Sequence, residues 1–186
     1  MSQPKTTLRA RVSSAILEAA ATVLAQHGEH ASMADVADAA GMARATVYRY
    51  FPNRDALLDA LAQLAVQDAD QRLRAGRLEQ VAIPDAFERA VRALVAVGDP
   101  FVVIAHQRTR PIATHFDHHI TTPLRQLIQR AQTHGEVRND LPATWLTEAL
   151  IGIIVSGLQT RPAPGIDDTV AAITSLFLNG AQHPPT

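Results

Sequence analysis

Apolar residues recur every three or four positions along most of the chain. Between residues 9 and 27 this repeat is carried by five side chains: Val12, Ile16, Ala20, Val23 and Leu24. Residues at this spacing share one face of an amphipathic helix. Gly28 comes directly after the segment, and glycine in that place favours a left-handed helix end. The pattern predicts a first helix over residues 9–27.

The same period continues in segments that glycine and proline separate. We predict further helices over residues 33–40, 44–50, 54–74, 84–97, 114–134, 142–159 and 167–179, and a short helical segment that ends at His106. No segment alternates apolar and polar residues as a half-buried strand does. The fold class is therefore all-α with about nine helices. Residues 1–54 are expected to form one domain and residues 55–186 a second.

Composition narrows the possible chemistry. The sequence has no cysteine, which excludes disulfides, thiolate nucleophiles and cysteine-ligated zinc. No apolar run approaches the roughly 20 residues that span a bilayer, and no apolar block follows the first residues as in a secretory signal. We therefore expect a cytoplasmic protein without a membrane partner. The first 54 residues carry six Lys or Arg against four Asp or Glu, and the remainder eleven against fourteen, which fits DNA binding at one end of the chain.

Residues 32–51 have the pattern of two short helices joined by a tight turn. Ser32 can cap the first helix, with Asp35 three residues on. Gly41 stands where the turn requires a positive φ. The apolar residues of this stretch are expected to form the shared core: Val36, Ala40, Val47 and Phe51. The outward face of the second helix would then carry four residues beside a major groove: Arg44, Ala45, Tyr48 and Arg49.

From Ala10 to about Leu64 the chain resembles the N-terminal domain of the TetR family of transcriptional repressors. The resemblance rests on the helix and turn of residues 32–41, on Thr46-Val47-Tyr48-Arg49-Tyr50-Phe51, and on the helix start Asn53-Arg54-Asp55-Ala56-Leu57-Leu58. It implies a helix-turn-helix that binds double-stranded DNA. The DNA contacts that it implies are Arg9, Arg11, Ser32, Arg44, Ala45, Thr46, Tyr48, Arg49, Tyr50 and Arg54.

Two positions of this motif have specific consequences. Arg44 is the first candidate for reading a base, because a bidentate arginine–guanine contact contributes about 1–3 kcal/mol of discrimination. Ala43 departs from the Ser or Thr that the family commonly has at that place. A lost helix cap typically costs about 1 kcal/mol, so one phosphate contact of the family is in doubt here.

For the second domain the resemblance implies a helical bundle that dimerises and holds a small-molecule effector. Small residues at helical spacing suit close helix packing, and the expected dimer interface comprises Trp145, Ala149, Gly152, Ile153, Ser156, Val170, Ile173 and Phe177. The alternative is a core within one chain. Two-fold symmetry would place two recognition helices about one DNA turn apart, on an inverted-repeat operator.

A mostly apolar effector pocket is expected in the same domain. Its candidate lining residues are Phe87, Val91, Phe101, Ile104, His106, Phe116, His119 and Trp145, each of which also suits an ordinary core. Arg108 and Arg110 could pair with an acidic effector or lie on the surface. His115, His118 and His119 raise the hypothesis of a metal site, against which solvated histidines are the simpler interpretation.

The sequence thus predicts a homodimeric repressor that a small hydrophobic ligand releases from its operator, without a cofactor or a bound metal. An architectural DNA-binding protein without effector control is the alternative. A helical enzyme is not expected, because no glycine-rich phosphate loop or nucleophile motif is present.

Overall fold

The chain divides into two compact units in the computed structural model, which describes residues 4–106, 113–160 and 165–181. The first unit ends at Leu64 and the second begins at Ala65. The division lies inside a single helix, α4 (Arg54–Ala75), and not at residue 54 as the sequence suggested. The early part of α4 belongs to the first unit because its apolar residues Leu57, Leu58 and Leu61 are buried there, with at most 2% of each exposed.

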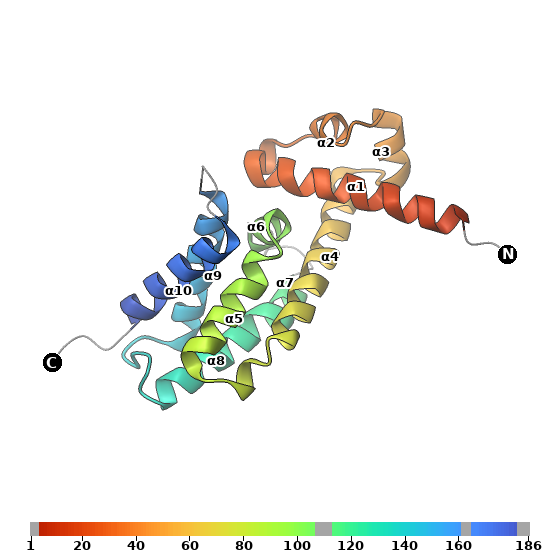
Figure 1. Ribbon diagram of the computed structural model, residues 1–186. Coiled ribbons are helices and arrows are strands. Elements are labelled where there is room, and N and C mark those ends of the chain that lie inside the picture. The colour runs from red at the N-terminus through yellow and green to blue at the C-terminus, as the bar shows by residue number, and fades with distance from the viewer. Residues whose placement is uncertain (1–3, 107–112, 161–164, 182–186) are drawn as a thin grey trace. The chain divides into compact units, whose positions relative to one another are not determined.

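The first unit is made of helices (Figure 1) whose buried apolar residues form one core. Its elements are α1 (Pro4–His27), the 3₁₀ turn η1 (Gly28–His30), α2 (Met33–Ala39), α3 (Arg44–Tyr50) and the first part of α4. Helix α2 packs against both α1 and α3. Four apolar residues were expected in this core, of which Val36, Val47 and Phe51 are buried and Ala40 is half-buried.

The second unit is a bundle built around α5. After α4 come the 3₁₀ turn η2 (Leu78–Gln80), α5 (Ile83–Val95), α6 (Asp99–His106), α7 (Ala113–Phe116), the π-helical turn η3 (Asp117–Thr121), α8 (Thr122–Thr133), α9 (Ala143–Gln159) and α10 (Ile166–Ala181). Helix α5 packs against α8, α9 and α10, and α10 lies beside α9 (Figure 1).

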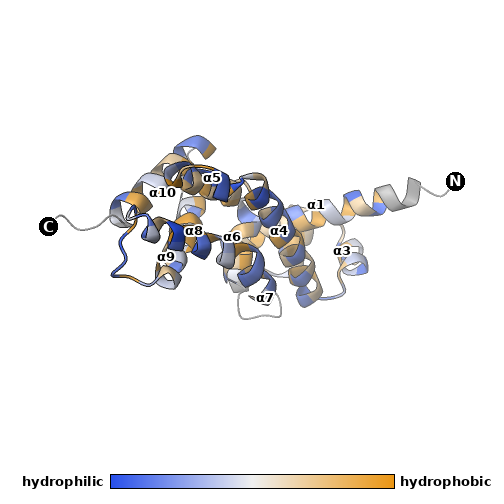
Figure 2. Ribbon diagram, turned by 90° about the horizontal axis from the view of Figure 1, so that it is seen from below, coloured by the Kyte–Doolittle hydropathy of each residue, from blue (hydrophilic) through white to orange (hydrophobic). Residues whose placement is uncertain are grey.

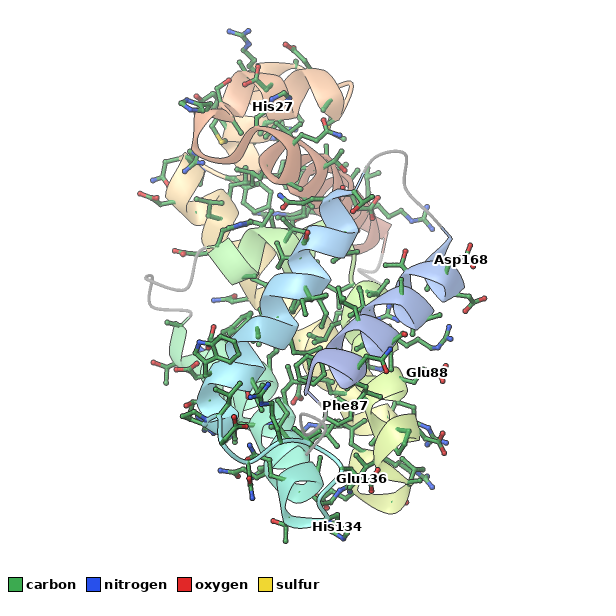
Figure 3. The ribbon with its side chains drawn as sticks, turned by 90° about the vertical axis from the view of Figure 1, so that its left-hand side faces the viewer. His27, Phe87, Glu88, His134, Glu136 and Asp168 are labelled. Carbon is green, nitrogen blue, oxygen red and sulfur yellow. The ribbon has the colours of Figure 1, made fainter. Side chains whose placement is uncertain are left out.

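Hydrophilic and hydrophobic residues alternate along the helices in bands (Figure 2), as expected for helices with one apolar side. In the second unit this side is rich in aromatic rings. The centroids of Phe87 and Phe177 lie 5.4 Å apart, and those of Phe101 and Phe116 lie 6.2 Å apart. Figure 3 shows Phe87 inside the bundle and its neighbour Glu88 on the outside.

All nine predicted helices are present, and the described residues contain no strand. Segments α7, η3 and α8 together form the predicted helix over residues 114–134, but a π-helical turn interrupts it. The periodicity did not predict this turn. Within the described ranges, no helix is both long and apolar enough to cross a membrane.

Candidate nucleic-acid interface

Helix α3 presents the polar face that the sequence predicted. Its one buried residue is Val47, which is fully covered. Arg44, Ala45 and Arg49 are exposed, and 48% of Tyr48 is exposed. Thr46 and Tyr50 are half-buried at the edges of this face. We call the exposed set Arg44, Ala45, Tyr48 and Arg49 the α3 face. It carries two guanidinium groups and a phenol beside a small residue, which suits close approach to base edges and phosphates.

The ring of Tyr50 links α1 to α3. The guanidinium carbon of Arg9 lies 5.9 Å from the ring centroid, and that of Arg49 lies 5.7 Å from it. Both distances are within the range of a cation–π contact. Tyr50 therefore supports two cations at one edge of the α3 face. Arg11 is exposed on α1.

The start of α2 is fixed by a reciprocal cap, as the sequence predicted. The Ser32 hydroxyl accepts a hydrogen bond from the Asp35 backbone N–H at 3.2 Å, and the Ser32 backbone N–H donates to Asp35 Oδ2 at 2.8 Å. The bonds that the Ser32 backbone N–H and hydroxyl donate to the carboxylate lower the pKa of Asp35, and the charges of His27 and Arg44 lower it further. The Ser32 hydroxyl also donates to Asp35 Oδ2 at 2.7 Å. Ser32 therefore has a structural role as the cap of α2, and its contact with DNA stays a prediction.

The turn before α3 combines a positive φ with a missing cap. Gly41 has a φ of 63°, which L side chains rarely adopt. Ala43 occupies the N-cap position with an extended backbone, φ −62° and ψ 139°, and has no side chain that can accept a hydrogen bond from the helix. The first N–H groups of α3 are therefore open to a phosphate oxygen.

Replacing Ala43 by serine is expected to raise the free energy of unfolding of the first unit by about 0.5–1 kcal/mol, because a hydroxyl at an extended N-cap accepts a bond from the first helical turn. Thermal unfolding followed by circular dichroism measures this effect. Ala45→Ser is the matched control, since Ala45 is exposed inside α3 and serine there lowers helix propensity. An equal response of the two variants would contradict the assignment of Ala43 as the N-cap.

Arg54 has a role that the sequence did not indicate. Its Nε donates to the carbonyl of Ala31 at 3.2 Å, and one terminal nitrogen donates to the carbonyl of Gly28 at 3.3 Å. The side chain is half-buried. Arg54 was expected to grip phosphate, but these bonds tie the start of α4 to the connection between α1 and α2. We therefore assign it to the scaffold that holds the α3 face.

The eight candidate pocket residues differ widely in their burial. Five of them fill the core of the second unit with no exposed surface: Phe87, Val91, Phe101, Ile104 and Phe116. Trp145 is 58% exposed, and His106 is an exposed residue whose Nδ1 lies 2.8 Å from the Val102 carbonyl. The five buried candidates pack in the core of the second unit, and their assignment to an effector pocket stays a prediction. Arg108 and Arg110 lie outside the described residues.

A groove of about 600 Å³ lies elsewhere in the second unit, between α4, η2, η3 and α8. None of the eight candidates lines it, although His119 lies next to it. His119 Nδ1 is 3.0 Å from Asp70 Oδ1, and Asp70 is a lining residue. Within the described ranges, no three His, Asp or Glu side chains gather as a metal site requires.

The expected dimer residues fall into two sets. Trp145, Gly152 and Ser156 are exposed along one side of α9, and Ala149 and Ile153 are half-buried on it. In contrast, three α10 residues of the predicted interface lie in the core of the same chain: Val170, Ile173 and Phe177. Their burial against α5 and α9 corrects that part of the assignment. The exposed large apolar residues of α10 are Ile166 and Leu176, at 55% and 64%.

An exposed helix bearing arginines, held by a tight turn over a shared core, is the arrangement of a helix-turn-helix DNA-binding protein. Residues 16–61 match the family model described as bacterial regulatory proteins, tetR family. These residues therefore form a domain of the tetR family of bacterial regulatory proteins.

Relatives extend this similarity to most of the chain. The HTH-type transcriptional repressor LfrR of Mycolicibacterium smegmatis is 29% identical over 156 residues, which are 81% of this chain and 79% of LfrR. The HTH-type transcriptional regulator NfxB of Pseudomonas aeruginosa is 24% identical over 164 residues, 83% of this chain and 86% of NfxB. The crystal structure of LfrR in complex with proflavine, from Mycobacterium smegmatis, is similar with a TM-score of 0.76 and 26% identity, over 95% of this chain and 99% of that one. The chain is a DNA-binding transcriptional regulator.

Proposed function

We propose that the protein is a homodimeric repressor that binds an inverted-repeat operator through its α3 faces and is released by a small molecule. The α3 face carries this proposal, because its two arginines and Tyr48 are exposed over a buried Val47. Arginine at such a position reads guanine in the major groove. The similarity to the repressor LfrR supports the sign of regulation.

The exposed side of α9 supports the dimer. Trp145, Gly152 and Ser156 follow one another at seven and four residues and so share one side of the helix. Leu176 and Ile166 of the neighbouring α10 are also exposed, and α9 and α10 together form one face of the unit (Figures 1 and 3). Apolar side chains gathered on such a face mark an interaction surface. In the proposed dimer this face meets its symmetry copy.

Release by a ligand follows from linkage between two sites. A ligand that binds only conformations unable to span both half-sites lowers the population that binds DNA. Helix α4 is the proposed lever, because it is one continuous helix that belongs to both units. The complex of LfrR with proflavine supports a small molecule as the effector.

Selecting bound fragments from random DNA is expected to yield an inverted repeat, and Arg44→Ala is expected to weaken binding to that repeat about 5- to 150-fold per half-site. The reason is that an arginine–guanine pair contributes about 1–3 kcal/mol of discrimination. Fluorescence anisotropy with the selected duplex measures the affinity. The variant should also lose preference at one base pair of each half-site, because the missing contact reads that pair.

Arg125→Ala is the control, since Arg125 lies on α8 in the second unit and bonds to Thr122 at 3.1 Å. It should leave DNA affinity unchanged. Unaltered affinity and sequence preference in Arg44→Ala would show that the α3 face does not read DNA. A weak A·T preference in place of an inverted repeat would favour the architectural alternative.

A further inference from the structure

The groove between α4, η2, η3 and α8 combines an apolar floor with an excess of positive charge. Leu73 of α4 and Leu127 of α8 line it and are each 4% exposed. Three arginines line it as well, Arg74, Arg77 and Arg130, against two carboxylates, Asp70 and Glu79. Its volume of about 600 Å³ falls within the range of sites for small organic ligands.

The charges of the groove are not all paired. Asp70 is bound on two sides, by Arg74 Nε at 2.8 Å and by His119 Nδ1 at 3.0 Å. Burial by itself raises the pKa of Asp70, but the bonds from Arg74 and His119 outweigh it and keep the pKa below its ordinary value. Asp70 is therefore ionised and already neutralised at neutral pH. A cationic ligand would have to compete with Arg74 and His119 for it.

Arg130, unlike Asp70, has a hydrogen-bonding group without a partner among the described residues. Its Nε is buried, and within the described part of the chain it has no hydrogen-bond partner. One terminal nitrogen reaches the Val81 carbonyl only at 3.5 Å, which is the limit of a hydrogen bond. A buried donor without an acceptor is unfavourable. An anion that reorients this guanidinium in the groove would supply the missing acceptor.

The backbone conformation of Arg77 is a second, independent indication that the groove is a binding site. Its backbone has φ 47° and ψ 51°, which places it in the left-handed region, and no other non-glycine residue of the described ranges has a positive φ. Glycine is the residue that adopts this conformation without strain, and Gly76 stands directly before it. Backbone strain of this kind is concentrated at functional sites.

The third indication of a binding site is the π-helical turn η3, which interrupts the helix containing α7 and α8. Such turns occur frequently at functional sites. Here the turn contains His118, which lines the groove, and His119, which binds Asp70. Arg77, Arg130 and His118 thus bring hydrogen-bond donors to the groove from the turn before η2, from α8 and from η3.

We propose that this groove binds a small amphipathic anion, whose carboxylate is held by Arg77 and Arg130 and whose apolar body covers Leu73 and Leu127. The proposal deepens the proposed function, because it names the chemical class of the effector. An acidic group matches the unsatisfied Nε of Arg130 and the guanidinium of Arg77, and a short hydrocarbon matches Leu73 and Leu127. The sequence had indicated a small, mostly apolar ligand and a different set of eight lining residues, so the proposal changes both the position and the class of the site.

The test uses three probes with the same chain and different heads: decanoate, decanol and decyltrimethylammonium. Binding to the full chain is measured by isothermal titration calorimetry at pH 8 and at concentrations below micelle formation. Decanoate is expected to bind once per chain, decanol at least about tenfold more weakly, and the ammonium compound more weakly still, because hydrogen bonds to a charged group are strong. Equal or tighter binding of decyltrimethylammonium would overturn the proposal.

Two variants place the site. Arg130→Met keeps the aliphatic length and removes the charge, and Arg77→Gly removes the charge while glycine suits the left-handed backbone. Each is expected to weaken decanoate binding about tenfold. Arg77→Gly should not unfold at a lower temperature than the natural chain, which separates a binding role from a structural one. Arg125→Met is the matched control on α8, since Arg125 does not line the groove, and it should bind decanoate normally.

Wild-type affinity for decanoate in both Arg77→Gly and Arg130→Met would show that the groove is not the anion site. DNA affinity is measured separately with the selected duplex. If decanoate binds in the groove but leaves the DNA complex intact, the anion site stands and effector release in the proposed function fails. If decanoate does not bind while the α3 face still binds DNA, the anion site fails and the DNA-binding regulator stands.

Discussion

Replacing Phe87 by alanine is expected to lower the free energy of unfolding by about 3–5 kcal/mol. Phe87 has no exposed surface, and its ring lies 5.4 Å from that of Phe177. Removing the ring leaves a cavity where α5 packs against α10. Urea denaturation followed by circular dichroism at one fixed protein concentration measures the change.

The neighbouring residue Glu88 provides the control, because it lies on the outer side of the same helix (Figure 3). Its carboxylate pairs with Arg92 at 3.1 Å on the surface, and such pairs contribute at most about 1 kcal/mol. Glu88→Ala should therefore change stability by less than about 1 kcal/mol. If Phe87→Ala also lowers the free energy of unfolding by less than about 1 kcal/mol, Phe87 is not a core residue and its assignment to a ligand pocket is favoured.

Replacing Gly152 by arginine is expected to abolish the dimer and to weaken operator binding by at least about 100-fold. A Cβ at Gly152 meets no atom within 4 Å in the protomer, so the substitution is compatible with the fold of one chain. In the proposed dimer the same position faces the partner, where a long charged side chain would separate the two α9 helices. Two linked half-site contacts exceed one by about 10²–10⁴-fold in affinity, and a monomer loses that gain. Sedimentation velocity and anisotropy with the selected duplex measure the two effects.

Two comparisons identify the cause. Gln129→Arg adds the same charge at an exposed position of α8 and should leave dimerisation and DNA binding unchanged. Gly157→Arg should instead destabilise the protomer, because a Cβ there would lie 2.8 Å from Ile173 Cδ1. A Gly152→Arg protein that remains dimeric would contradict the α9 interface. The far-ultraviolet circular dichroism of Gly152→Arg should remain that of the natural chain, because the substitution removes the partner and leaves the fold of the protomer intact.

The helix-turn-helix could be predicted from the sequence because its determinants are local. Ser32 and Asp35 are three residues apart, Gly41 acts through its own φ, and the spacing of Val47 from Val36 follows from two short helices and one turn. Such features depend on near neighbours and on helical periodicity. The exposed α3 face follows from them by subtraction of the buried residues.

The hydrogen-bond partners of Arg54 could not be predicted from the sequence. It stands in the expected helix start, but its partners are the carbonyls of Gly28 and Ala31, 26 and 23 residues away along the chain. An arginine near DNA-binding residues has the same appearance in the sequence whether it binds phosphate or backbone. Only the position of its guanidinium distinguishes the two.

The second unit shows most clearly which features the sequence determines and which depend on the tertiary structure. The sequence by itself determined its helices, its lack of cysteine chemistry and the apolar sides of α5, α9 and α10, because these depend on composition and period. Which apolar sides face each other was decided by the tertiary structure. Packing placed Phe87, Phe101 and Phe116 in the core, left Trp145 exposed, and brought Arg77 and Arg130 to one groove from positions 53 residues apart. Periodicity identifies a buried side but not its partner, and charges that converge from distant elements leave no local pattern.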